Sequence, residues 1–255
     1  MCLIVFAYNA HPKYKFIFAA NRDEFYDRPT KQADYWKDHP ELLCGKDLQA
    51  GGTWMGITKG GRFAAVTNYR DLKNIKENAP SRGILTLDFL NNNISAEDYY
   101  ENIKPSLQDY NSFNLLLGSV DELFYFSTHT SGFKKLEPGI YGLSNAILNT
   151  EWPKVKKSKD VLSLLLKNDE IHPWELLSIL NDTQKAKDEE LPETGVGLEW
   201  EKILSSIFIQ SPKYGTRCST AVVADIENNV RFAEKTFFGN QGAFSNKDYS
   251  FKIKD

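Results

Sequence analysis

The sequence is poor in the residues and runs that mark several large classes of protein. Only three cysteines occur in 255 residues, which excludes a small secreted scaffold held together by many disulfides. The four histidines lie far apart and form no short metal-ligand motif. No apolar run approaches the roughly 18 residues of a membrane-spanning helix. We therefore expect a protein that does not span the membrane and holds no metal.

Charge of one sign is also scarce. Lys and Arg total 31 against 34 Asp and Glu, for a formal net charge of −3. Nucleic acids bind proteins with a marked basic surface, so no nucleic-acid partner is predicted. Neither a P-loop nor a Gly-x-Gly-x-x-Gly motif follows a strand, which leaves nucleotide binding unsupported. The balance favours a small-molecule substrate or ligand.

The first eight residues carry no secretion signal. They are apolar, but no basic residue precedes them and no small-residue cleavage site follows. The almost unbroken apolar run of Cys2–Tyr8 instead predicts a strand that is buried on both faces. With so few cysteines, the expected location is the cytoplasm.

Hairpins at both ends of the chain, with helices between them, predict the fold class. Strands are expected over 2–8, 14–20, 51–58, 62–68, 112–118, 123–128, 218–226 and 230–238, and helices over 81–92, 95–103, 151–167 and 174–180. Residues 25–50 contain Pro29 and Pro40 and are expected to form a long irregular loop. Consecutive hairpins form antiparallel sheets, whose faces the helices must cover. No linker is visible, so we predict a single α+β domain over residues 1–255.

Cys2 is the first candidate for chemistry. Removal of Met1 would place a thiol and a free α-amino group on this one residue. Such an amine has a pKa near ~7.7–8.0, so it is partly unprotonated at neutral pH and can activate its own side chain. The alternative is a small apolar side chain buried in a strand, which is the commoner role of a free cysteine. Cys2 by itself favours that alternative.

Four polar segments near strand or helix ends add weight to a site. Residues 21–24 follow the strand that pairs with the first one, so an arginine there would lower the pKa of the Cys2 thiol and an acid would hold the α-amine. Residues 67–71 end another apolar strand. Asn145 precedes a helix and is of the type that donates hydrogen bonds to an oxyanion. Arg217 precedes Cys218 at a strand start and is suited to bind a carboxylate.

Seven motifs in these and neighbouring segments resemble those of the NRDE family, the homologues of transport and Golgi organisation protein 2. They follow in family order along nearly the whole chain. The motifs are Met1-Cys2-Leu3-Ile4, Ala20-Asn21-Arg22-Asp23-Glu24, Gly51-Gly52-Thr53-Trp54-Met55-Gly56, Thr67-Asn68-Tyr69-Arg70, Ser81-Arg82-Gly83, Gly142-Leu143-Ser144-Asn145 and Tyr214-Gly215-Thr216-Arg217.

The family is in turn similar to the N-terminal-nucleophile hydrolases of the choloylglycine hydrolase and penicillin V acylase type. This resemblance implies a four-layer αββα sandwich of antiparallel sheets. It implies hydrolysis of a linear amide or thioester of a small molecule, for which no cofactor is required.

The resemblance also implies roles for individual residues. The nucleophile matches Cys2. The arginine and aspartate of those hydrolases match either Arg22 with Asp23 or Asn21 with Glu24; their spacing differs here, and charge favours the first pair. The first oxyanion asparagine is replaced by Thr58, with Asn68 as a possible substitute. The second oxyanion asparagine matches Asn145, and the late arginine matches Arg217.

A second function is compatible with the same fold. The resemblance links the family to intracellular haem trafficking and lipid metabolism, so the chain is alternatively a non-catalytic protein that binds haem or a lipid. Haem iron takes an axial His, Cys, Met or Tyr. His129 and Cys2 are conceivable ligands, although His129 is more simply a surface strand residue and no haem motif is present.

Overall fold

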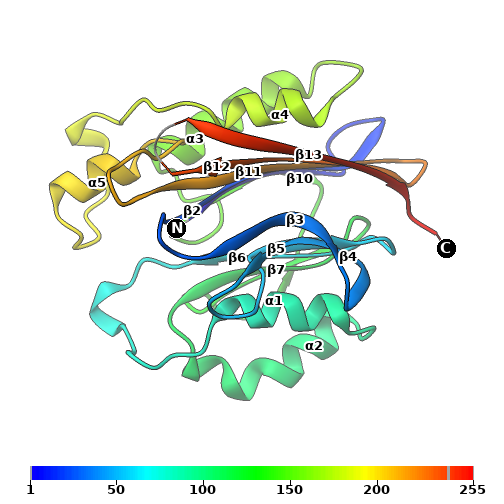
Figure 1. The fold of residues 1–255 in the computed structure, drawn as a ribbon, viewed down its shortest axis with the longest axis horizontal. Coiled ribbons are helices and arrows are strands. Elements are labelled where there is room, and N and C mark those ends of the chain that lie inside the picture. Colours follow the sequence, from blue (N-terminus) through cyan, green and yellow to red (C-terminus); the bar gives the residue numbers. More distant parts are fainter. Residues whose placement is uncertain (1, 240–241, 255) are drawn as a thin grey trace. The chain divides into compact units, whose positions relative to one another are not determined.

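The computed structural model describes residues 2–239 and 242–254, and the chain divides into two compact units (Figure 1). The first unit comprises the residues up to Asp27 together with Pro138–Phe251. The second comprises Arg28–Glu137 and the residues from Lys252 on. That the two units form a single domain stays a prediction.

The first unit is built on a six-stranded antiparallel sheet, counted over the described residues. Its strands lie in the order β10-β1-β2-β11-β12-β13. Their bounds are β1 Cys2–Tyr8, β2 Tyr14–Phe25, β10 Gly139–Leu143, β11 Tyr214–Asp225, β12 Asn229–Phe238 and β13 Ala243–Lys252; the helices of this unit are α3 Pro153–Leu165, α4 Pro173–Ile179 and α5 Leu198–Leu204, with a 3-10 turn at Asp188–Glu190.

β1 lies inside this sheet, between β10 and β2, and all seven of its residues are buried. The prediction of a strand buried on both faces is confirmed. Leu3, Val5 and Ala7 lie on one face, where they pack in a common apolar cluster with side chains of α3 and α4 such as Leu162 and Leu176. Figure 1 shows these two helices on that face of the sheet.

The second unit repeats the plan of a sheet with helices on one face. Within the described residues its sheet has seven strands in the order β3-β4-β5-β6-β7-β8-β9. The bounds are β3 Thr30–Trp36, β4 His39–Asp47, β5 Met55–Thr58, β6 Arg62–Asn68, β7 Phe113–Ser119, β8 Leu123–Ser127 and β9 Lys134–Lys135; α1 is Arg82–Asn91 and α2 is Ala96–Ile103, with 3-10 turns at Leu72–Asn74 and Lys104–Asp109. Phe89 of α1 and Tyr99 of α2 pack against Phe113 and Leu115 of β7. The predicted α+β class with antiparallel sheets is confirmed.

The expectation of an irregular loop over residues 25–50 is wrong, because β3 and β4 lie within this segment. β3 is the edge strand of the second sheet, and Ala33 is its only fully buried residue. Its sequence therefore lacks the apolar run by which buried strands are recognised. Pro40 lies near the start of β4, a position where a strand tolerates proline.

Two glycines from different family motifs pack back to back in the second unit. A Cβ atom on Gly52 would lie 2.5 Å from the carbonyl carbon of Gly83, and one on Gly83 would lie 3.0 Å from the carbonyl oxygen of Thr53. The backbone N–H of Thr53 donates to the carbonyl oxygen of Gly83 at 3.1 Å. This close approach requires glycine at both positions and fixes the start of α1 beside the segment before β5.

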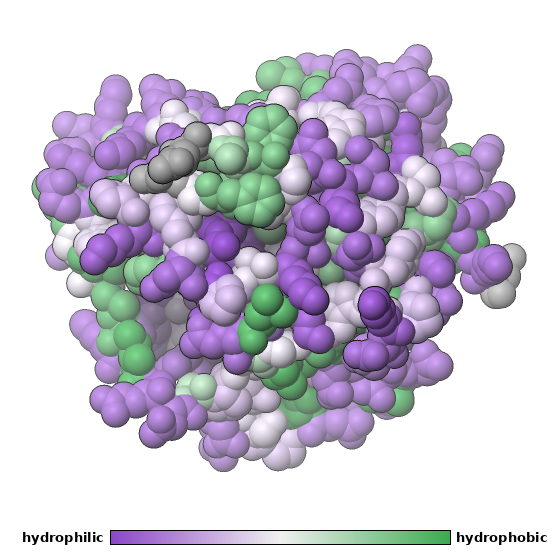
Figure 2. Space-filling view, in the orientation of Figure 1, coloured by the Kyte–Doolittle hydropathy of each residue, from purple (hydrophilic) through white to green (hydrophobic). Residues whose placement is uncertain are grey.

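The surface in Figure 2 is mainly hydrophilic, with hydrophobic side chains in small separate groups. Single exposed apolar residues are normal on a globular protein. No helix of residues 2–239 and 242–254 is both long enough and apolar enough to cross a membrane.

Candidate functional site

Two of the candidate side chains and a second thiol lie in a row across three neighbouring strands of the first sheet. In the strand register, Cys2 of β1 is opposite Arg22 of β2, and Arg22 is opposite Cys218 of β11. Residues directly opposite each other point to the same face of a sheet. Because side chains alternate along a strand, this is the face opposite to the one that carries Leu3. The sheet thus places a positive charge between two thiols.

Asn21 lies on the other face and has a structural role. Its Nδ2 donates to the carbonyl oxygens of Leu180 and Ile207, both at 2.9 Å, and the hydroxyl of Ser219 donates to its Oδ1 at 2.5 Å. These bonds tie β2 to the end of α4 and to the segment before β11. Between the two pairs left open by the sequence, this geometry favours Arg22 with Asp23, since the amide of Asn21 is already engaged.

Asp23 follows directly and is 1% exposed. The hydroxyl of Thr216, its register partner on β11, donates to Oδ1 at 2.7 Å. Burial raises the pKa of the Asp23 carboxyl, while the charge of Lys154 on α3 and the hydrogen bond from Thr216 act in the opposite direction. Asp23 is therefore a buried acid whose charge depends on a lysine of the neighbouring helix.

Cys2 is 7% exposed. Burial raises the pKa of its thiol; the charge of Asp23 raises it further, whereas the charge of Arg22 and the backbone amide of Asp23 lower it. The predicted removal of Met1 concerns a residue outside the described part of the chain. Burial thus favours the protonated form of the Cys2 thiol, whereas the adjacent Arg22 favours the thiolate.

Asn145 lies in the loop that follows β10, beside the start of β1. The hydroxyl of Ser144 lies 3.0 Å from the carbonyl oxygen of Cys2, to which it donates, and 3.3 Å from Oδ1 of Asn145. Asn145 is 1% exposed. The loop is closed by Asn149, whose Oδ1 accepts the backbone N–H of Gly142 at 2.9 Å. Asn145 is thereby held next to the residue that binds the backbone of Cys2.

Arg217 occupies a β-bulge. The register of β11 against β2 shifts between Thr216 and Cys218, so Arg217 is the extra residue. Its Nη1 donates to the carbonyl oxygen of Phe25 at 2.7 Å. Burial lowers the pKa of the Arg217 guanidinium, and the nearby charge of Arg22 adds to this effect. The two arginines are therefore close neighbours at the end of β2.

The second unit contains the other two residues considered as hydrogen-bond donors to an oxyanion. Asn68 is the last residue of β6 and is half-buried. The hydroxyl of Thr58 accepts the backbone N–H of Arg62 at 3.1 Å and so serves the turn between β5 and β6. The first unit thus brings together Cys2, Arg22, Asp23, Asn145 and Arg217; Asn68 belongs to the second unit.

His129, the conceivable haem ligand, is engaged within the second unit. Its ring stacks on Tyr69 with centroids 3.7 Å apart, and Nε2 lies 3.1 Å from the hydroxyl oxygen of Ser112. No group of three or more His, Cys, Asp or Glu side chains in residues 2–239 and 242–254 is arranged to hold a metal ion.

Two residues near the row were missed by sequence reasoning. Cys218 was not among the candidates, yet it lies directly opposite Arg22. Glu234 of β12 is 1% exposed and accepts hydrogen bonds from the hydroxyls of Thr220 and Thr236 at 3.1 and 3.0 Å. Burial and the charge of Glu234 hold the pKa of the Cys218 thiol well above its usual value. The position of Cys218 directly after a family motif was the available signal; Glu234 had none.

The whole chain is similar to proteins of one family. The family model described as Transport and Golgi organisation 2 matches residues 1–239. The Transport and Golgi organization protein 2 homolog of Bos taurus is 34% identical over 263 residues, covering 94% of each chain.

Two solved structures share the fold at low sequence identity. The C2A mutant of conjugated bile acid hydrolase from Clostridium perfringens has a TM-score of 0.52 and 11% identity, with 99% of this chain and 98% of that chain covered. The Caenorhabditis elegans ortholog of N-acylethanolamine-hydrolyzing acid amidase has a TM-score of 0.50 and 9% identity, with 87% and 92% covered. The fold implied by the resemblance to N-terminal-nucleophile hydrolases is confirmed.

Proposed function

The chain belongs to the Transport and Golgi organisation 2 family, and from this premise we propose that it is an N-terminal-nucleophile hydrolase that cleaves a linear amide or thioester of a small molecule. The observation that carries the proposal is the placement of Cys2 opposite Arg22, with the buried acid Asp23 next along β2. The shared fold with two hydrolases supports it.

The thiol requires activation, because its burial disfavours the thiolate. Removal of Met1 would expose the α-amine of Cys2 as the base for its own thiol. Asp23 would hold the protonated amine, and Arg22 would stabilise the thiolate. A reducing cytoplasm, the location that we propose, would keep the thiol reduced; Cys2 forms no disulfide with another described residue.

The reaction then has two halves. The thiolate attacks the carbonyl carbon, the α-amine passes the thiol proton to the leaving nitrogen or sulfur, and an acyl thioester forms on Cys2. A water molecule then attacks the carbonyl carbon of this thioester, and the amine takes a proton from the water. The amine returns the proton to the Cys2 sulfur as the bond between sulfur and the acyl group breaks, which releases the acid. Asn145 would donate a hydrogen bond to the oxyanion in both halves. Arg217 would complete the charge network or bind a substrate carboxylate.

Covalent trapping tests this function. Protein with Cys2 at its N-terminus is treated with a mild activated acyl ester and examined by intact mass and peptide mass spectrometry. We expect one acyl group on the N-terminal peptide, and none in Cys2→Ala. The matched control Cys44→Ala removes a buried thiol of the second unit and should retain the adduct. Retention of Met1 in protein isolated from cells, or equal labelling of Cys2→Ala, would contradict the proposal.

A second candidate is binding of haem or a lipid without turnover. The burial of Cys2 and its raised thiol pKa favour this alternative, because a buried neutral thiol is a poor nucleophile. A cysteine sulfur can also be an axial ligand of haem iron.

Haem titration separates the two candidates. A saturable shift of the haem absorbance that disappears in Cys2→Ala, together with no acyl adduct, would favour the binding protein. An acyl adduct without any haem shift would favour the hydrolase. His129→Ala is the matched ligand control in the second unit.

A further inference from the structure

The first unit contains a basic pocket away from the row of thiols. Its volume is about 350 Å³, within the range of small-molecule sites. It lies between the start of α3, the segment 182–190, and the residues Ser205 and Ile207 that follow α5. Five lysines and three acids line it, and the lysines come from α3 and from residues 185–187.

Two of the three acids that line the pocket interact with other residues that line it. Asp182 forms an ion pair with Lys157, which also donates to Gln184 at 2.8 Å. Glu190 accepts the backbone N–H of Lys187 at 3.2 Å. Lys185 and Lys187 form no side-chain ion pair among residues 2–239 and 242–254. The pocket therefore keeps an excess of positive charge.

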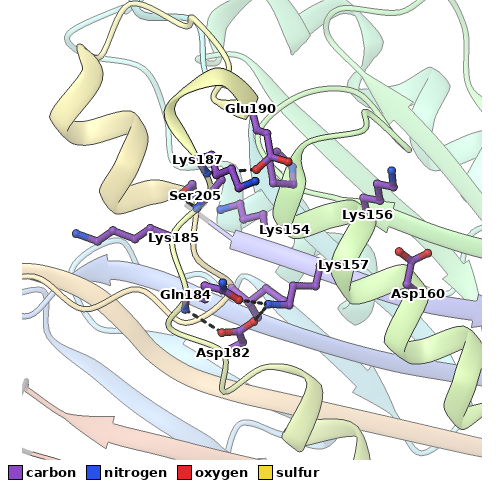
Figure 3. Close-up of a pocket in the computed structure, with 13 residues that line it drawn as sticks. Lys154, Lys156, Lys157, Asp160, Asp182, Gln184, Lys185, Lys187, Glu190 and Ser205 are labelled. Atoms are coloured by element: carbon purple, nitrogen blue, oxygen red, sulfur yellow. Dashed lines mark hydrogen bonds and ion pairs between the residues drawn. The ribbon is translucent and has the colours of Figure 1, made fainter.

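The lysines are distributed so that several can reach one ligand. Figure 3 shows Lys154, Lys187, Glu190 and Ser205 gathered at one end of the pocket, and Lys157, Asp182 and Gln184 at the other. Lys154 is 3% exposed, so part of the positive charge lies at the base of the pocket and not at its rim. The N-terminal end of α3, which carries a partial positive charge, lies at the same place.

We propose that this pocket binds the phosphate group of a small water-soluble molecule. Ammonium groups on flexible stems act as point charges that suit phosphate, and two or three of them match its two negative charges. The volume accommodates a phosphate with a short organic group. The proposal is independent of turnover at Cys2.

The pocket also adjoins the candidate active site. Lys154 lines the pocket and its charge acts on the carboxyl of Asp23. A bound anion would offset part of that charge and so weaken the ionised form of Asp23. Binding of an anion in the pocket would in this way change the ionisation of Asp23, the residue next to Arg22.

The test is a titration of the full chain with inorganic phosphate at constant ionic strength, followed by the backbone amide resonances in NMR spectra. We expect saturable shifts confined to residues 154–157 and 182–190. Lys185→Gln with Lys187→Gln should weaken binding about tenfold or more, because two of the ammonium groups that line the pocket are lost. Both side chains are exposed, so this variant is expected to fold.

The matched control is Lys167→Gln with Lys213→Gln, which removes two exposed charges of the same unit outside the pocket. Its affinity should equal that of the parent protein. Shifts that never saturate, or equal weakening in both double variants, would overturn the proposal, because they indicate general charge screening. Binding to phosphatidic acid vesicles without saturable shifts by inorganic phosphate would also overturn it and indicate a lipid surface instead.

Discussion

Two polar segments follow an apolar strand in the same way and reach different environments. Residues 21–24 stay inside β2, where Asn21, Arg22 and Asp23 are 0%, 8% and 1% exposed. Residues 68–71 leave the second sheet, because β6 ends at Asn68 and all four residues remain partly exposed.

Strand pairing explains the difference. β2 is paired with β1 as far as Arg22 and with β11 as far as Phe25, so the polar side chains are fixed by neighbours on both sides. Beyond Asn68 the chain is not paired on both sides with other described residues. Asn74 Nδ2 donates to the Asp71 carboxylate at 2.9 Å, and the hydroxyl of Ser112 donates to it at 3.4 Å. His129 stacks on Tyr69. A polar segment that remains in a sheet acquires defined positions for chemistry, whereas one that leaves it forms a solvated turn.

The largest effect is expected from Asn21→Ala. This change leaves the carbonyl oxygens of Leu180 and Ile207 and the hydroxyl of Ser219 without their buried partner. At about 1 kcal/mol per lost bond, the free energy of unfolding should fall by about 3 kcal/mol in urea denaturation. Asn74→Ala, the control in the exposed segment, should change it by less than about 0.5 kcal/mol. Similar losses in both variants would contradict the comparison.

Arg22→Gln should make the Cys2 thiol less reactive. Removing the positive charge raises the pKa of this thiol still further, so less thiolate is present at a given pH. A rise of one unit in the pKa of this thiol would slow its alkylation by iodoacetamide about tenfold near pH 8. Arg231→Gln, on β12 toward the other end of the same sheet, is the control and should leave the rate unchanged. An unaltered rate in Arg22→Gln would refute the assigned influence of this charge.

His129→Ala, which removes a contact with the exposed segment, should have a smaller effect on stability. It removes the stacking of His129 on Tyr69, an interaction of about 0.5–1.5 kcal/mol in aromatic pairs. Thermal and urea unfolding both measure this loss. A loss as large as that of Asn21→Ala would show that the second segment is as firmly fixed as the first.

The two segments should also respond to pH with opposite signs. Burial raises the folded pKa of Asp23 above 3.8, so its contribution to stability is present below that value and lost as pH rises through the folded pKa. The side-chain hydrogen bond from Asn74 lowers the pKa of Asp71, so its contribution is present above 3.8 and lost as pH falls through the folded pKa.

Replacing each acid tests these signs in a series of urea unfolding curves. Relative to the parent protein, Asp23→Asn should gain stability as the pH rises above about 4. Asp71→Asn should be less stable than the parent above about pH 4 and approach it on acidification, by a small amount that salt reduces. Equal signs for the two variants would be inconsistent with the burial of Asp23.

The sequence predicted those parts of the fold that rest on continuous apolar patterns. β1 is buried along its whole length, as expected, and α2 lies within the helix expected over 95–103. β3 and β13 were missed because edge strands bury few side chains and carry a weak pattern. Pattern reasoning responds to burial, so it finds the centre of a sheet before its edges.

For the candidate site, the residue types could be predicted but their alignment could not. The motifs pointed to Cys2, Arg22 and Asp23, which the register of β1 and β2 brings together. The place of Cys218 opposite Arg22 depends on a register shift in β11 that no local pattern encodes. Asn68 has the right chemistry for an oxyanion, but its strand belongs to the other unit.

The bulge at Arg217 has a consequence for strand pairing. Because Arg217 is the extra residue between the Thr216–Asp23 and Cys218–Arg22 pairs, its deletion would leave both pairs aligned. Deletion of Arg217 would therefore turn no side chain of β11 to the opposite face. The extra residue thus adds a guanidinium beside Arg22 without disturbing the pairing of the two strands.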